Sequence, residues 1–174
     1  MKRLAGIAVF IFIFGFIGQN VFAQNLKFGH IASDELIQSL PEYDSATKKL
    51  EKFRQDLINA LELMQVEMNN KSEAYQKDQK NLTEIVRQTK EQELMDMNNR
   101  IQQFQSSAQQ QLQEKQAELF QPIMAKIDKA IKDIGKEQGF VYIFTVGQGS
   151  TLVYFDETKS TNVLPLAKAK LGIK

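Results

Sequence analysis

The stretch that decides the fold runs from residue 44 to residue 121 and reads DSATKKLEKFRQDLINALELMQVEMNNKSEAYQKDQKNLTEIVRQTKEQELMDMNNRIQQFQSSAQQQLQEKQAELFQ. It contains no proline and no glycine, and Glu, Gln, Lys, Leu, Met and Ala dominate it. These residue types have high intrinsic helix propensity. We therefore expect this stretch to be almost entirely helical.

Large apolar residues in this region recur three and four residues apart, which is the spacing of a coiled-coil seam. In the first half the row consists of Leu50, Phe53, Leu57, Leu61, Met64, Met68 and Tyr75. In the second half it consists of Leu94, Met97, Ile101, Phe104, Ala108, Leu112, Leu119, Ile123, Ile127, Ala130 and Ile134. One straight helix of this length would exceed about 100 Å at 1.5 Å per residue, so a hairpin of two antiparallel helices is the economical arrangement.

The turn of this hairpin is poorly marked, because the stretch contains no glycine. The weakest part of the seam is residues 76–81, which read QKDQKN and are wholly polar. Thr83 is suited to cap a new helix with its hydroxyl group. We therefore place the tip near residues 80–83 and the whole arm at residues 44–138.

Two short segments flank the arm and are expected to form a body. In the first, residues 24–43, LKFGHIA at residues 26–32 reads as a strand that leads into a short helix. The second, residues 139–174, contains the apolar run VYIFTV at residues 141–146, which is typical of a buried strand. After a glycine turn, TLVYF at residues 151–155 is expected to return as its β-hairpin partner.

The chain then closes with a short helix. Asn162 can cap this helix, and Pro165 lies in its first turn, where a missing N–H is harmless. The resulting α+β body of three strands and two short helices is smaller than a domain that usually supports its own hydrophobic core. Since the chain has no Cys and therefore no disulfide, we expect assembly with further copies to complete the body.

The N-terminus has the three parts of a signal peptide. Two basic residues precede an apolar stretch over residues 4–17, and Val21 and Ala23 stand where a signal peptidase accepts small residues. An N-terminal membrane anchor is the alternative, but the apolar stretch is short for a hydrocarbon core of roughly 30 Å. We expect residues 1–23 to be a signal peptide cleaved after Ala23, and the mature protein to be exported.

The composition argues against several functions. The chain has 22 Lys and Arg against 21 Asp and Glu, and two of the basic residues lie in the expected leader, so the mature chain is nearly neutral and lacks the basic character of a nucleic-acid-binding protein. His30 is the single histidine and Cys is absent, so neither a zinc site nor a catalytic thiol is suggested. We expect no enzyme, no metal and no cofactor.

The order of these elements resembles that of the Skp/OmpH family of periplasmic chaperones, over essentially all of the chain after residue 23. The stretches that carry the resemblance are Phe28-Gly29-His30-Ile31 with Ser33-Asp34-Glu35-Leu36, Leu40-Pro41-Glu42-Tyr43, Arg87-Gln88-Thr89-Lys90-Glu91, Gln121-Pro122-Ile123, Pro165-Leu166 and Lys170-Leu171-Gly172. None of them is a catalytic fingerprint. Their order and spacing make the resemblance specific.

The resemblance implies a periplasmic homotrimer in which the strands of three subunits join into a central β-barrel and three helical arms surround a cavity. It further implies that the cavity holds unfolded outer-membrane β-barrel proteins, without ATP, before their insertion into the membrane. We expect the shared barrel core to contain Ile31, Val141, Ile143, Val153 and Phe155. Family members are strongly basic, whereas this chain is nearly neutral.

Apolar side chains on the arm are the candidates for contacting such unfolded clients. The candidate residues are Met64, Met68, Tyr75, Met95, Met97 and Phe104. Thioether side chains are flexible and suit promiscuous apolar contacts, although packing within the seam would explain the same residues. The glutamines at residues 102–103 and 109–111 are interpreted as a solvated surface in preference to a client-binding one.

The tip carries a small excess of positive charge. Its basic residues are Lys71, Lys77, Lys80, Arg87 and Lys90, and the acids among them are Glu73, Asp78 and Glu84. Ordinary solvation explains this charge, and contact with a membrane surface is the alternative. A structural or adaptor role in the cell envelope is the rival function, but the flanking segments are short for the additional domains of such adaptors.

Overall fold

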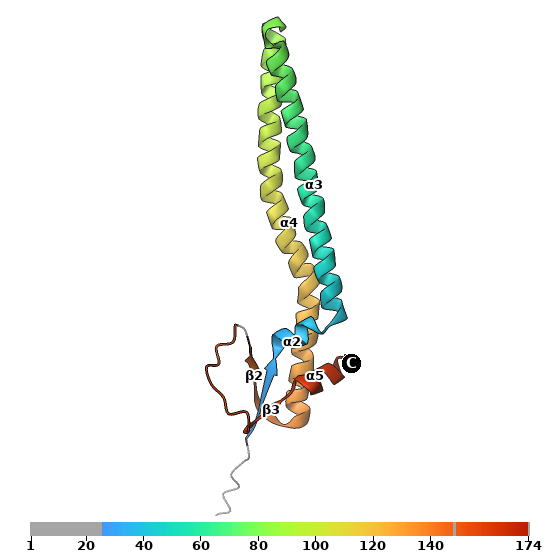
Figure 1. Ribbon diagram of the computed structural model, residues 1–174, viewed down its shortest axis with the longest axis vertical. Helices are drawn as coiled ribbons and strands as arrows, with labels where there is room; N and C mark the ends of the chain where they lie inside the picture. Colours follow the sequence, from blue (N-terminus) through green and yellow to red (C-terminus); the bar gives the residue numbers. More distant parts are fainter. Residues whose placement is uncertain (1–25, 148, 174) are drawn as a thin grey trace, which may run out of the picture.

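The computed structural model describes residues 26–147 and 149–173, so the expected signal peptide at residues 1–23 lies outside the described residues. The elements follow the order β1 (Lys27–Ala32), α2 (Ser33–Gln38), α3 (Pro41–Asp78), η1 (Gln79–Asn81), α4 (Glu84–Gln138), β2 (Phe140–Val146), β3 (Ser160–Asn162) and α5 (Leu164–Lys170). Figure 1 shows a long arm of α3 and α4 that projects from a small body of strands and short helices. The described chain is mostly helical, with one small sheet.

The two arm helices begin and end at residues suited to those positions. Pro41 lies in the first turn of α3, where its missing N–H does not interrupt the helix. Thr83 caps α4 by accepting a hydrogen bond from the Val86 amide. Gly139 ends α4 with a φ of 70°, a left-handed conformation that favours glycine. Between the helices, the single 3-10 turn η1 reverses the chain.

Burial along the arm follows an eleven-residue repeat. The inward positions of α3 are Leu50, Phe53, Leu57, Leu61, Met64, Met68, Ser72 and Tyr75, spaced three, four and four residues apart. In α4 the same spacing runs through Met97, Ile101, Phe104, Ala108, Leu112, Lys115, Leu119 and Ile123. Because eleven residues in three turns give 3.67 residues per turn, the arm does not follow the 3.5-residue repeat of a left-handed coiled coil.

The sheet is parallel, with strand order β2-β1-β3. The predicted β-hairpin between residues 141–146 and 151–155 is therefore wrong. Gly147 and Gly149 have positive φ values, and the Ser150 hydroxyl group donates to the Thr145 carbonyl, which turns the chain out of line with β2. The chain then crosses to the far edge of β1, where residues 160–162 form the third strand.

The loop between β2 and β3 lies over the face of the sheet that is turned away from α4. Within it, the Phe155 ring packs at 4.7 Å from the His30 ring on β1, whereas Val153 is 99% exposed. His30 also bonds Ser160 of β3 through Nδ1. The single histidine therefore has a structural position between β1, β3 and this loop.

The other face of the sheet packs on helices and forms the core of the body. Its fully buried large residues are Ile31, Leu36, Leu40 and Val163. The lower part of α4 contributes Ile123, Ile127 and Ile134 to the same cluster. Gly29 allows β1 to lie close to this cluster, since a Cβ there would meet side-chain atoms of Ile143 and Val163 at 3.1 Å.

Candidate functional site

The arm surface is the first candidate site, because it exposes apolar side chains that no other element covers. Met95, one of the candidate client-binding residues, is 55% exposed on α4. Met64, Met68, Tyr75 and Phe104 are half-buried in the seam. Met97 is only 4% exposed, because it lies on the inward row of α4, and this burial removes it from the surface.

Four exposed apolar residues of the distal arm were missed by the sequence analysis. They are Leu63, Val66, Ile85 and Val86, of which Leu63 and Ile85 are more than two-thirds exposed. Leu63 and Val66 fall between the inward positions Leu61, Met64 and Met68. The available signal was this departure from the seam spacing, since an apolar residue that does not fit the inward row must face solvent or a partner.

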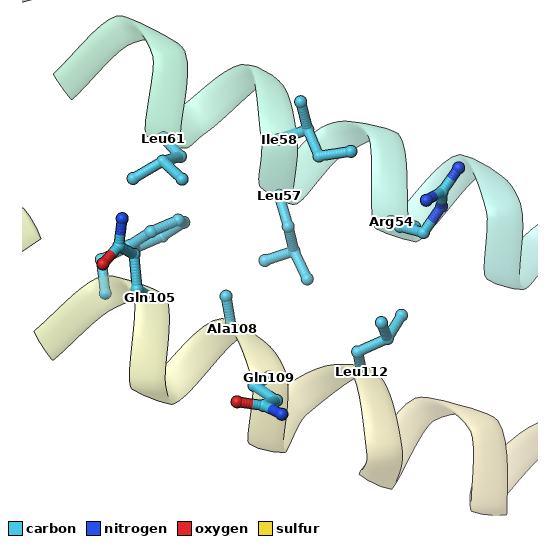
Figure 2. A pocket seen from close by; sticks show the side chains of 9 residues that line it. Arg54, Leu57, Ile58, Leu61, Gln105, Ala108, Gln109 and Leu112 are labelled. Atoms are coloured by element: carbon cyan, nitrogen blue, oxygen red, sulfur yellow. The ribbon is translucent and has the colours of Figure 1, made fainter. Parts of the chain in front are cut away.

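The middle of the arm contains an apolar groove of about 250 Å³ between α3 and α4. Its lining consists of Arg54, Leu57, Ile58, Leu61, Phe104, Gln105, Ala108, Gln109 and Leu112. In Figure 2, Leu57 and Leu61 reach from α3 toward α4, and Gln105 and Gln109 stand on the α4 side. The small Ala108 side chain opposite Leu57 leaves the space that larger residues fill elsewhere in the seam.

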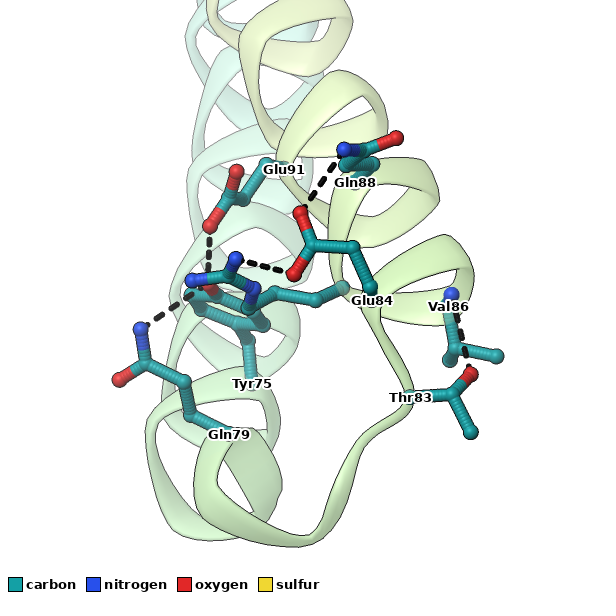
Figure 3. A network of polar contacts seen from close by, with 8 residues as sticks. Tyr75, Gln79, Thr83, Glu84, Val86, Gln88 and Glu91 are labelled. Atoms are coloured by element: carbon teal, nitrogen blue, oxygen red, sulfur yellow. Dashed lines mark hydrogen bonds and ion pairs between the residues drawn. The ribbon is translucent and has the colours of Figure 1, made fainter.

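The tip is closed by a polar network, shown in Figure 3. The Tyr75 hydroxyl group donates to Glu91 across the two helices and accepts a hydrogen bond from Gln79 at 3.1 Å. The hydrogen bond to Glu91 raises the pKa of Tyr75 above its usual value. On α4, Arg87 pairs with Glu84 and thereby lowers the pKa of that carboxyl group.

The predicted basic tip residues are partly neutralised by these local pairs. Arg87 is engaged with Glu84, and Lys71 lies 3.7 Å from Glu67 and 3.9 Å from Glu93 on the opposite helix. Lys77 and Lys80 are exposed near the turn, and Lys90 is half-buried. The positive charge of the tip is thus weaker than its residue count suggests.

The sheet is the second candidate site, because one of its edges is unpaired and aromatic side chains on one of its faces are exposed. β1 lies between β2 and β3, so the outer edge of β2 has no strand partner among the described residues. On the face away from α4, Tyr142 stacks with Phe28 at 6.3 Å and with Phe144 at 5.8 Å. Tyr142 and Phe144 remain exposed. An aromatic surface beside a free strand edge is suited to pair with another strand.

The predicted barrel-core residues divide between two environments. Ile31 is fully buried in the subunit's own core, and Ile143 packs against the same cluster. Val141 and Val153 are exposed, and Phe155 is half-buried against His30. On the face of the sheet that the loop partly covers, the exposed surface is formed by Tyr142 and Phe144, with the half-buried Phe28 beside them, more than by the predicted aliphatic residues.

The described residues include no cluster of three or more side chains suited to hold a metal ion. Within residues 26–147 and 149–173, every helix is too short or too polar to cross a membrane. A family model described as "Outer membrane protein (OmpH-like)" matches residues 27–171. No curated protein matches the chain significantly.

Proposed function

This chain belongs to the OmpH-like outer membrane protein family, and on that premise we propose that it is a periplasmic, ATP-independent holdase chaperone. In this function it binds unfolded outer-membrane β-barrel proteins between its helical arms and prevents their aggregation before membrane insertion. The family membership supports a chaperone-type role toward outer membrane proteins. The N-terminal sequence, with its signal-peptide pattern, supports export.

One observation carries this proposal: the arm, formed by α3 and the part of α4 that pairs with it, stands away from the body and keeps apolar side chains exposed. Exposed Leu63, Val66, Ile85 and Met95 are spread along its distal half. Scattered shallow contacts hold an unfolded chain through their number, and each one breaks easily. Release into a membrane then requires no nucleotide, because insertion offers deeper burial.

We propose a homotrimer as the active form. The free edge of β2 and the aromatic face of Phe28, Tyr142 and Phe144 support assembly through the sheets of neighbouring subunits, which would close them into a shared barrel. Arms that descend from three joined bodies would then surround one cavity. Phe144→Asp, which places a charge on the exposed face of the sheet, is expected to dissociate the assembly, as measured by light scattering.

The direct test of the function is an aggregation assay. An outer-membrane β-barrel protein unfolded in urea is diluted into buffer with or without the mature protein, and no nucleotide is added. We expect turbidity to be suppressed at stoichiometric amounts of chaperone. Aggregation that proceeds unchanged would reject the holdase function and leave the adaptor role as the alternative.

Client capture should depend only weakly on salt, because the mature chain is nearly neutral and two tip cations are paired with acids. Dissociation constants measured between about 0.05 and 0.5 M salt should change by less than about tenfold. A change of two orders of magnitude would show that charge governs capture. Lys77→Gln with Lys80→Gln should slow association modestly and leave holdase capacity largely intact.

A further inference from the structure

One side of the arm carries a row of amide side chains on α4. It consists of Asn98, Gln102, Gln105, Gln109, Gln113 and Gln116. These residues are four, three, four, four and three positions apart, which is the spacing of the inward row of the same helix. The row therefore runs parallel to the seam along one side of α4. We call it the amide flank.

The side chains of the amide flank are exposed, and their polar groups are free. Among the residues that the structure describes, none of the six makes a side-chain hydrogen bond within the chain. Some other glutamines of α4 are engaged within the chain, since Gln92 donates to Asp96 and Gln110 donates to Glu114. A partner can therefore form hydrogen bonds with the donors and acceptors of the amide flank without breaking side-chain hydrogen bonds within the chain.

The amide flank is also uncharged along its length. It continues at Phe120 and Met124, each four residues further along α4. The charged residues of this segment lie elsewhere, with Lys115 on the inward row and bonded to Glu118. A charged side chain is either a donor or an acceptor, whereas an amide is both. An uncharged amide row therefore matches the alternating N–H and C=O groups of a peptide backbone.

Two apolar wells lie along the same row. The upper well is the groove of about 250 Å³ between α3 and α4, with Gln105 and Gln109 in its lining. The lower well is a shallow groove of about 540 Å³ near the base of α4, lined by Gln113, Gln116, Ala117, Phe120, Gln121, Met124, Ala125 and Asp128. Each well therefore combines apolar surface with two amides of the row and one charged side chain, Arg54 in the upper well and Asp128 in the lower one.

We propose that the amide flank and its two wells bind an extended, uncharged polypeptide segment in which apolar and polar side chains alternate. The amides bond the backbone of this segment, and its apolar side chains enter the wells. Phe104 and Phe120 are 16 positions apart, roughly 24 Å along a helix. An extended segment of about seven residues spans this distance.

This inference deepens the proposed holdase function, on which it rests for the identity of the client. Transmembrane β-strands are segments of about ten residues with alternating apolar side chains and little charge on the lipid-facing positions. The amide flank thus suits the strand segments of an unfolded outer-membrane protein. It would recognise their backbone and spacing without reading a particular sequence.

The test compares two matched double variants of the mature protein. Gln102→Lys with Gln109→Lys places two charges on the amide flank, whereas Gln103→Lys with Gln110→Lys places the same charges one position further around α4. All four residues are exposed and each pair is seven positions apart, so the two variants should be equally helical by circular dichroism. The probe is a fluorescent, end-blocked ten-residue peptide that alternates Leu or Phe with Ser or Thr.

We expect Gln102→Lys with Gln109→Lys to weaken peptide binding about fivefold to tenfold and the control variant to change it less than about twofold. A second peptide with the same side chains but N-methylated backbone amides should also bind at least about fivefold more weakly to the unaltered protein, because it lacks backbone donors. Photo-crosslinking from position 58, on the rim of the upper well, should capture the first peptide.

Equal affinity of the two variants, or equal affinity for the two peptides, would overturn the inference. A change of oligomeric state in the amide-flank variant with unchanged peptide binding would also overturn it, and would assign the flank to contacts between copies of the chain. These outcomes are independent of the aggregation assay. A protein that binds the peptide and fails to suppress aggregation would reject the holdase function and keep the binding site.

Discussion

The body and the arm of this protein are stabilised in opposite ways. In the body, Ile31, Leu36, Leu40 and Val163 are all less than 2% exposed. In α3, the buried set contains only Ala46, at the base of the arm, and the rest of the inward row is half-exposed. A helix that packs on one partner buries one stripe, whereas these four residues lie in one cluster with residues of α4 and α5 and are covered from several sides. The body therefore supplies the stability, and the arm keeps its surface for binding.

Replacement of Leu36 by Ala should have the largest effect. This residue is fully buried in the body, so the variant should lose about 2–5 kcal/mol of unfolding free energy. Leu57→Ala, a matched change in the half-exposed seam, should cost less than about 2 kcal/mol, because the groove beside it already leaves space. Urea unfolding at one protein concentration measures both, and equal losses would contradict the contrast between body and arm.

Gly29 and Gly135 should respond to alanine in opposite directions. At Gly29 the added Cβ would press on Ile143 and Val163 at 3.1 Å, so Gly29→Ala should destabilise the protein by about 1–3 kcal/mol. At Gly135, inside α4, the same Cβ would meet an ordinary contact at 3.7 Å. Gly135→Ala should therefore stabilise by about 0.5–1 kcal/mol. Thermal unfolding measures both changes. A change in stability of the same sign in the two variants would contradict the difference in packing at the two glycines.

Pro122 lies inside α4, between the arm and the body. Its ring removes one backbone hydrogen bond and favours a bend at this point. Figure 1 shows α4 changing direction between arm and body. Pro122→Ala should straighten the helix and stabilise it by about 1 kcal/mol. Small-angle scattering measures the change in shape, and an identical profile would show that packing at the arm base causes the bend.

Tyr75→Phe removes the hydrogen bonds that join α3 to Glu91 on α4 and to Gln79 in the turn. We expect faster hydrogen exchange of the amides near the tip and unchanged exchange in the body, because the ring itself stays in the seam. Mass spectrometry of peptides covering residues 70–95 measures this. Faster exchange in the body as well would mean that the tip network stabilises the whole fold.

The smallest expected effect concerns Glu42, which pairs with Lys126 at 2.6 Å and so ties the start of α3 to α4. The hydrogen bond from Lys126 lowers the pKa of Glu42 below its usual 4.5. The pair therefore contributes its stability above pH 4.5 and loses it as the pH falls through the lowered pKa. Glu42→Gln should differ slightly from the unaltered protein at pH 7 and match it at low pH. A difference that grows toward low pH would contradict this sign.

The helical character of residues 44–121 and the family could be predicted from the sequence. Helix propensity and seam spacing are properties of the local sequence. A continuous stretch of Leu, Met, Glu, Gln and Lys without Gly or Pro therefore indicates a helix by itself. The resemblance to the OmpH-like family is confirmed by the match over residues 27–171. The exposed residues Leu63 and Ile85 could also have been identified, because they depart from the same spacing.

The partners of the strands were decided only by the tertiary structure. Residues 151–155 have as strong a β-pattern as residues 141–146, yet the third strand is the polar segment Ser160–Asn162, which pairs in parallel with β1. A strand is stabilised by the strand that pairs with its edge, and here that partner lies far away in the sequence.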